Sequence, residues 1–194
     1  ASGEYLGSMV ADEIAALFPK RRSVTRATFA AGRRTWEAFT SNNPRDLESH
    51  MKGDIVGLPF MRSALRRLCE EYPWTLDGLS RSHRQALQAV AQGPARNDEL
   101  FRRAQAREEA RFLADAPFYA MLEDLQREPA LIEGEDGMLS PTGLGRRVLA
   151  ADADVLDDAP IDRWVGGVHL HGRDVVRWDD DRSSFRSVLG AVDS

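Results

Sequence analysis

Residues 131–142 read LIEGEDGMLSPT, in which two short apolar pairs flank an acidic segment that contains two glycines. Leu131-Ile132 and Met138-Leu139 lie on either side of the turn-forming residues 134–137, a pattern that predicts a short β-hairpin. Residues 140–142, Ser-Pro-Thr, follow directly and predict a helix start, because hydroxyl side chains cap helix N-termini and proline is tolerated there. We therefore expect a hairpin that leads straight into a helix.

Three helical patterns precede this hairpin. Ser80 caps the first, which ends at Gly93, and Asn97 caps a second that extends to about residue 113. The third starts at Asp115, and its apolar stripe consists of Phe118, Met121, Leu122 and Leu125. Three helices, a hairpin and a closing helix are the order of a winged helix-turn-helix, so residues 78–151 are expected to form a winged-helix-like subdomain.

Residues 1–77 are expected to form a helical subdomain. Helices are predicted at residues 12–18, from Ser23 or Thr25 onwards, at 44–51 and at 59–72. In the second of these, aromatic side chains recur at spacings of three and four. This stripe needs a cover, so we expect Trp36 and Phe39 to be buried against the helix of residues 59–72.

Residues 152–194 begin with an acidic loop and then become rich in valine and tryptophan. Residues 164–170 and 175–178 lie on either side of residues 171–174, His-Gly-Arg-Asp, which predicts a second hairpin with its turn at these four residues. The expected class is mainly α with small β-hairpins (α+β). A helical subdomain (1–77) is followed by a winged-helix-like subdomain (78–151) and by a C-terminal part (152–194) that consists of the acidic loop, a β-hairpin and a tail.

The composition suits a folded protein, because 42% of the 194 residues are hydrophobic. No apolar stretch approaches the roughly 20 residues that cross a bilayer, and no leader peptide opens the chain, so we expect a cytoplasmic protein that does not bind membranes. Residues 1–111 contain 18 Lys and Arg against 14 Asp and Glu, whereas residues 112–194 contain 8 against 17. Nucleic acid would therefore be attracted to the first half of the chain.

Short motifs are spread along almost the whole chain: YLG (5–7), ALFPKRR (16–22), WEAF (36–39), LPF (58–60), EYP (71–73), DGLS (77–80), EEARFL (108–113), TG (142–143), IDRWVGGVHL (161–170) and RWD (177–179). Together they resemble uncharacterised bacterial proteins that carry domain of unknown function 1835 (DUF1835) in their N-terminal half. The resemblance implies that this chain corresponds to the C-terminal part of a longer protein. His171 departs from the family pattern, in which the histidine at 169 is typical. The family has no established activity, so the resemblance implies an architecture and no mechanism.

Two histidines are the best candidates for chemistry. Alternate residues of a strand project to one face, so His169 and His171 could hold a transition metal together with Asp162, Asp174 or Asp179. A metal site needs a third ligand at a defined spacing, which the sequence alone does not supply. An ordinary hairpin with a hydrogen-bonded His169 is therefore the favoured interpretation, and no metal site is predicted.

No catalytic residue and no cofactor are expected in this chain, because it contains neither a Gly-x-Ser-x-Gly motif nor a phosphate-binding loop. Cys69 lies in an amphipathic pattern and is predicted to be a small core residue. Adjacent residues of a helix diverge by about 100°, so Glu108 and Glu109 do not face one substrate. We expect them on a solvated face with the arginines at 102, 103 and 107. His83 is also expected at the surface.

Two arginines and two tryptophans of the C-terminal segment could form a recognition surface. Together with His169, they would stack against a ligand or a partner protein; they are Arg163, Trp164, Arg177 and Trp178. Packing is the favoured interpretation, because tryptophan fills cores well. We hypothesise that both tryptophans pack against the helical body, with an aspartate at 162 or 179 paired to one of the arginines.

Three functions remain open. A nucleic-acid-binding module would present arginines of the winged segment to phosphates, namely Arg96, Arg102, Arg103, Arg107 and Arg111. The expected wing, residues 133–137, is acidic and would repel DNA. We therefore favour a protein-interaction or scaffolding module that binds the family's N-terminal domain or another protein, with its oligomeric state open. An enzyme whose active site lies in that N-terminal domain is the third possibility.

Overall fold

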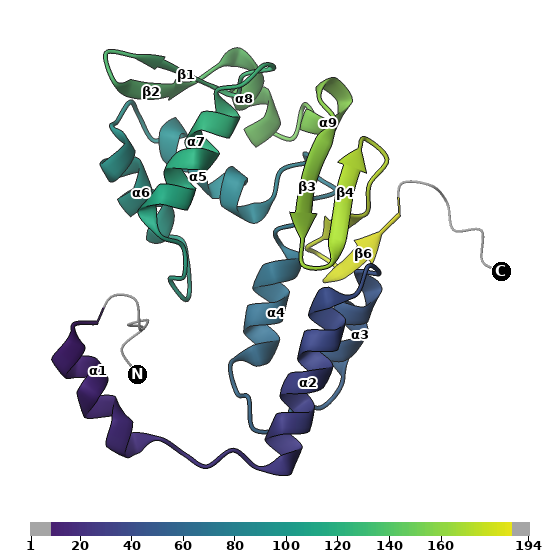
Figure 1. The fold of residues 1–194 in the computed structure, drawn as a ribbon. Helices are drawn as coiled ribbons and strands as arrows, with labels where there is room; N and C mark the ends of the chain where they lie inside the picture. The colour runs from purple at the N-terminus through teal and green to yellow at the C-terminus, as the bar shows by residue number, and fades with distance from the viewer. Residues whose placement is uncertain (1–8, 188–194) are drawn as a thin grey trace.

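The computed structural model describes residues 9–187, and it consists of α-helices with three small antiparallel hairpins (Figure 1). The first helices are α1 (Ala11–Leu17), which continues into a 3-10 turn at Phe18–Lys20, α2 (Arg26–Thr40), α3 (Arg45–Lys52) and α4 (Met61–Cys69). The middle of the chain forms α5 (Arg81–Ala91), α6 (Asn97–Gln105), α7 (Asp115–Leu125), β1 (Ile132–Glu135), β2 (Met138–Pro141) and α8 (Gly143–Leu149). The last elements are α9 (Val155–Asp158), β3 (Ile161–Val165), β4 (Val168–Gly172), β5 (Arg177–Asp179) and β6 (Ser184–Arg186).

Small residues, rather than the aromatic stripe, form the buried face of α2. Its buried side chains are Ala31, Thr35 and Ala38, and the Thr35 hydroxyl lies 2.8 Å from Nε2 of His50 in α3. Short side chains allow two helices to approach closely, so this face packs and the bulky face turns outward. The prediction for Trp36 is therefore wrong, since this side chain is 64% exposed, while Phe39 is half-buried.

Residues 81–149 contain the predicted order of elements, three helices, a hairpin and a closing helix, and we call them the winged-helix-like unit. The β1–β2 register runs from Ile132 opposite Pro141 to Glu135 opposite Met138, which confirms the hairpin. The predicted caps at its two outer helices are also present, since Ser80 accepts from the backbone of His83 and Thr142 from that of Gly145. An antiparallel bridge between residues 95 and 139 adds a third strand position that the sequence did not indicate.

Helix α6 is shorter than predicted. It ends at Gln105 instead of near residue 113, and the Gln105 side chain donates a hydrogen bond of 2.6 Å to the carbonyl of Leu113. Residues 106–114 therefore form a loop before α7. This loop carries Glu108 towards α4, which a continued helix would not do.

The pairing predicted for the C-terminal segment is wrong. Residues 161–165 pair with residues 168–172 around a two-residue turn at Gly166-Gly167, and a separate hairpin joins β5 to β6. Gly166 has φ of 58°, which glycine adopts without steric cost, and two glycines between paired strands form the tight turn of a hairpin. The stretch 164–170 is thus a strand, a turn and a strand, and β4 ends in the segment where the turn was expected.

Two clusters of buried side chains form the core. One lies within the winged-helix-like unit and includes Leu87, Leu100, Phe118 and Ile132. The other is shared by the first helices and the C-terminal hairpins, where Tyr72, Trp178 and Phe185 pack edge to face. The backbone of Trp178 donates to the Pro73 carbonyl at 2.8 Å and its carbonyl accepts from Thr75 at 2.9 Å. Residues at the end of the chain therefore complete the core of its beginning.

Helix α1 stands apart from the other helices in Figure 1, and none of its residues is buried. An extended segment, residues 21–25, connects its 3-10 turn to α2. Among the helices of the described residues, none combines the length and the apolar composition that spanning a membrane requires.

Candidate functional site

The outer face of the β3–β4 hairpin brings together four side chains. Asp162 and Trp164 alternate with inward residues on β3, and His169 and His171 do the same on β4, so that all four are exposed. The register places Asp162 opposite His171 and Trp164 opposite His169. The inward side chains between them, which include Val165, Val168 and Leu170, belong to the core.

Asp162 contacts both histidines. Its Oδ1 lies 2.7 Å from Nε2 of His169, and its Oδ2 lies 3.6 Å from Nδ1 of His171. The hydrogen bond with His169 is the main reason why the pKa of the Asp162 carboxyl is lowered. The indole of Trp164 stacks on the His169 ring, with centroids 4.7 Å apart and planes at 5°. One carboxylate oxygen and two imidazole nitrogens lie within 4.8 Å of one another, a donor set that suits a transition metal.

The other three residues of the predicted recognition surface point inward. Trp178 is fully buried and its indole donates to Asp180 at 3.2 Å. Arg177 forms an ion pair with Asp154, and Arg163 donates to the backbone carbonyl of Glu71. The structure therefore brings together Trp164 and His169 only, and separates them from both arginines and from Trp178.

The packing hypothesis for this segment is correct for one tryptophan and wrong for the other. Trp178 packs against the helices, whereas Trp164 is 66% exposed because its position on β3 alternates outward. The predicted ion pairs also differ, since Asp162 binds the histidines and Asp179 binds Arg182 and Arg186.

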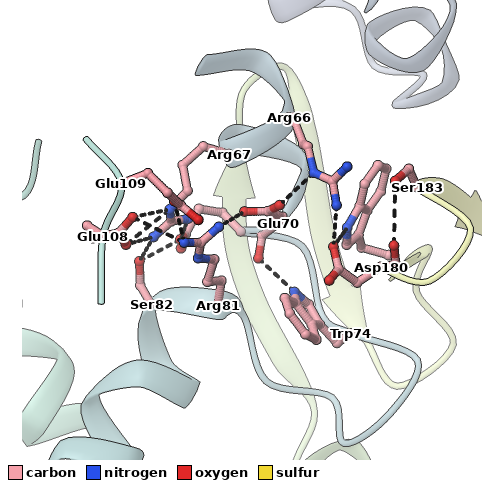
Figure 2. A network of polar contacts seen from close by, with 12 residues as sticks. Arg66, Arg67, Glu70, Trp74, Arg81, Ser82, Glu108, Glu109, Asp180 and Ser183 are labelled. Atoms are coloured by element: carbon pink, nitrogen blue, oxygen red, sulfur yellow. Dashed lines mark hydrogen bonds and ion pairs between the residues drawn. The ribbon is translucent and has the colours of Figure 1, made fainter. Parts of the chain in front are cut away.

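A network of charged side chains joins α4, the start of α5 and the loop after α6 (Figure 2). Arg67 contacts Glu108 at 2.7 Å, Glu71 at 2.5 Å and the Ser82 hydroxyl at 2.8 Å. The Glu108 side chain is only 5% exposed, so the solvated position predicted for it is wrong. No local pattern could indicate this contact, because Arg67, the partner of Glu108, lies 41 residues away along the chain.

The network continues through a second arginine. Arg81 contacts Glu70 at 2.6 Å and Glu109 at 2.7 Å, and Glu70 also binds Arg66, which reaches Asp180 at 3.1 Å. Every acid in this network faces an arginine of the same chain, with five carboxylates on three arginines, so the arrangement joins α4, the start of α5 and the loop after α6. We assign it a structural role.

Two titratable residues outside this network are also accounted for by packing. Cys69 is fully buried, and burial raises the pKa of its thiol to about 12, which confirms the predicted core position. His83 is half-buried, in contrast to the surface position predicted for it, and its Nδ1 lies 2.9 Å from the Ser80 hydroxyl. Burial, with a smaller contribution from Arg163, lowers the pKa of His83 to about 4.

The arginines predicted to contact nucleic acid lie just before α6, on it and in the loop after it. Arg102 and Arg103 form ion pairs with Glu99, and Arg103 also donates to the Gly93 carbonyl at 2.8 Å. The remaining three are exposed, namely Arg96, Arg107 and Arg111. The third helix of the unit, α7, reads DAPFYAMLEDL and contains neither Lys nor Arg. The helix that would enter a DNA groove in this fold is therefore acidic.

Four large apolar side chains, on α1, on the 3-10 turn after it and on α2, are exposed, although the sequence analysis expected the aromatic stripe of α2 to be covered. The exposed fractions are 45% for Ile14, 66% for Phe18, 73% for Phe29 and 64% for Trp36. We call these four residues the N-terminal apolar surface. Soluble proteins rarely expose large apolar patches, and such patches mark sites of contact with other molecules.

Comparisons of the chain with protein-family models, with curated proteins and with solved structures found no match. The resemblance to DUF1835 proteins therefore stays a prediction.

Proposed function

We propose that this chain is a protein-interaction module whose contact surface is formed by α1 and α2. The observation that carries the proposal is the N-terminal apolar surface, four large side chains that nothing covers within residues 9–187. Burying such side chains in an interface stabilises it by roughly 25 cal/mol per Å² of apolar area.

The two helices have complementary chemistry. In α1, Ile14 and the adjoining Phe18 follow one helical stripe, and the first turn carries Asp12 and Glu13. In α2, Phe29 and Trp36 lie seven residues apart on one stripe, and the helix contains Arg26, Arg33 and Arg34 against a single acid, Glu37. An acidic amphipathic helix therefore suits the α2 surface, and α1 is such a helix.

The occupant that this complementarity indicates is α1 of a second copy. Residues 21–25 are extended, and α1 lies apart from its own α2 (Figure 1). The apolar stripe of α1 is exposed. An exchange in which each copy places α1 on the α2 of the other would bury both stripes twice, through a two-fold symmetric contact. The proposed product is a homodimer built by exchange of this N-terminal helix.

Oligomeric state across a range of concentrations, measured by size-exclusion chromatography with light scattering, tests the proposal. We expect a dimer for the wild type, and a monomer for both Ile14→Ser/Phe18→Ser and Phe29→Ser/Trp36→Ser. Leu76→Ser, which removes a side chain that is 51% exposed in the loop between α4 and α5, is the matched control and should remain dimeric. An equimolar mixture of the two double variants restores one intact contact, so it should dimerise more than either variant alone.

A monomeric wild type would overturn the exchange, as would a dimer that survives both double variants. A monomer in which the α1 and α2 substitutions destabilise the fold would show that α1 packs on its own α2. Salt-sensitive binding of an oligonucleotide through Trp36 would replace the protein partner with nucleic acid.

A winged-helix nucleic-acid module is the weaker alternative. The exposed arginines on α6 and its loop favour it, but α7 and the β1–β2 turn are acidic, and both would lie near phosphates in a winged-helix complex. A binding assay against duplex DNA at increasing salt separates the two functions, and we expect no saturable binding.

A further inference from the structure

We infer that Asp162, His169 and His171 form a binding site for a divalent transition-metal ion such as Zn²⁺ on the outer face of the β3–β4 hairpin. The three ligand atoms come from paired strands, and they lie within 4.8 Å of one another. This site is separate from the N-terminal apolar surface and does not depend on the proposed dimer.

The hairpin geometry explains why three residues that are apart in sequence converge. Asp162 is directly opposite His171, and His169 lies one pleat further along the same face, next to the carboxylate. Neighbouring side chains on one face of an antiparallel pair are about 5 Å apart at Cβ, within the reach of one ion. Asp162 takes the middle position, because its two oxygens face the two different imidazoles.

The distances are close to those of a metal site. Ligand atoms that bind Zn²⁺ at about 2.0–2.1 Å in a tetrahedral arrangement are roughly 3.4 Å apart. The Asp162–His169 and Asp162–His171 contacts of 2.7 and 3.6 Å lie on either side of this value. Side-chain rotations are therefore enough to form the site, and the backbone can stay as it is.

The donor set determines the kind of ion. Two imidazole nitrogens with one carboxylate oxygen suit Zn²⁺ and its first-row neighbours, whereas Ca²⁺ and Mg²⁺ prefer oxygen ligands alone. Since three protein ligands leave at least one coordination position open, a water molecule or a group of a binding partner completes the shell.

The surroundings hold the ligands in place. The Gly166-Gly167 turn packs on the end of α2, where the Gly167 amide donates to the Phe39 carbonyl at 2.9 Å and a Cβ on Gly167 would lie 2.1 Å from the Thr40 oxygen. The indole of Trp164 lies parallel to the His169 ring and limits its rotation. A ligand set whose orientation is already restricted loses less conformational entropy on binding.

Zn²⁺ titration by calorimetry on the full chain without an affinity tag tests the inference. We expect one ion per chain, and at least tenfold weaker binding in each of Asp162→Asn, His169→Asn and His171→Asn. The side chains of these residues are 69%, 42% and 71% exposed, so the variants should fold as the wild type does. Asp174→Asn, which alters an exposed carboxylate just beyond β4, is the matched control and should bind as the wild type does.

Co²⁺ provides a second readout. Its absorption in the visible range reports nitrogen and oxygen coordination, and it should quench the fluorescence of Trp164, which stacks on a ligand. Trp164→Phe should keep the absorption and lose most of the quenching. Binding that is not saturable, that survives Asp162→Asn, or that weakens equally in Asp174→Asn would overturn the site.

Discussion

Glu108 and Glu109 are adjacent in sequence and differ in their surroundings. The Glu108 side chain is 5% exposed and lies between Arg67 and Arg81, whereas that of Glu109 is 79% exposed and contacts Arg81 alone (Figure 2). Removing one partner of a buried ion pair leaves the other charge without compensation. We expect Glu108→Ala to lower the free energy of unfolding by about 3 kcal/mol or more.

Glu109→Ala is the matched control for this prediction. An exposed ion pair contributes at most about 1 kcal/mol, so the variant should unfold close to the wild type in a urea titration. Equal effects of the two substitutions would show that the network in Figure 2 is as weak as a surface pair.

His83 should make stability depend on pH. Burial lowers its pKa to about 4, below the ordinary value of 6.5, so the unfolded chain binds a proton that the folded chain does not. This contribution is complete above the ordinary pKa and is lost as the pH falls towards the folded value. Between about pH 7 and pH 5 it amounts to about 2 kcal/mol.

His83→Asn removes this titration. The difference in unfolding free energy between the variant and the wild type should therefore shrink by about that amount over the same interval. Other titrating groups are present in both proteins and cancel in the difference. A difference that stays constant with pH would show that His83 is protonated in the folded protein as readily as in the unfolded one.

Individual residues were predicted well where a local pattern determines them and poorly where a distant partner does. The caps at Ser80 and Thr142 bind amides three residues away, so the sequence was enough. Glu108 binds Arg67 through a loop that ends α6 early, which periodicity does not report. The candidate metal site was predicted in part. The alternation of side chains along a strand indicated the two histidines, but only the register of the hairpin shows which of the three candidate aspartates, Asp162, lies beside them.

At the level of elements, α8 packs tightly on the hairpin before it. A Cβ on Gly145 would lie 2.0 Å from the backbone oxygen of Leu131, whereas one on Gly143 would meet no atom within 4 Å. We expect Gly145→Ala to destabilise the protein by about 1–3 kcal/mol, because the helix must move away from β1. Gly143→Ala should stabilise it by about 0.5–1 kcal/mol, because alanine restricts the unfolded chain.

The two variants have opposite expected signs on the same helix, so urea denaturation of both gives a sharp test. Destabilisation by Gly143→Ala, or a neutral Gly145→Ala, would contradict the packing of α8 against the start of β1.

Elements were predicted best where turn residues separate clear periodic patterns. The order of α5, α6, α7, the β1–β2 hairpin and α8 followed from the caps at Ser80 and Thr142 and from apolar stripes, whereas the cap predicted at Asn97 is wrong, because Asn97 is the first residue of α6. The C-terminal hairpins were wrong because Gly166-Gly167 was assigned to a strand interior, although its dipeptide is itself a turn signal. For α2, apolar spacing alone favoured the aromatic face, and the small residues that pack were overlooked.

For the whole molecule, the two ends of the described chain share one core, which the order of its segments along the sequence does not indicate. The C-terminal hairpins pack against the first helices, and Trp178 is buried in the same core cluster as Tyr72. The winged-helix-like unit has its own core and is inserted between these two parts. Whether the predicted boundaries at residues 77 and 151 separate independent folding units therefore depends on how firmly the two cores are joined.

Because the charged network of Figure 2 connects the two cores, we expect them to unfold together. Trp36, Trp74, Trp164 and Trp178 all lie outside residues 78–151, so tryptophan fluorescence reports the helical and C-terminal parts, while circular dichroism reports helices throughout. Because the buried Glu108 binds Arg67 on one side and Arg81 on the other, we expect the two signals to coincide in urea for the wild type. In Glu108→Ala the transitions should separate. Separate transitions in the wild type would show instead that the network does not couple the two cores.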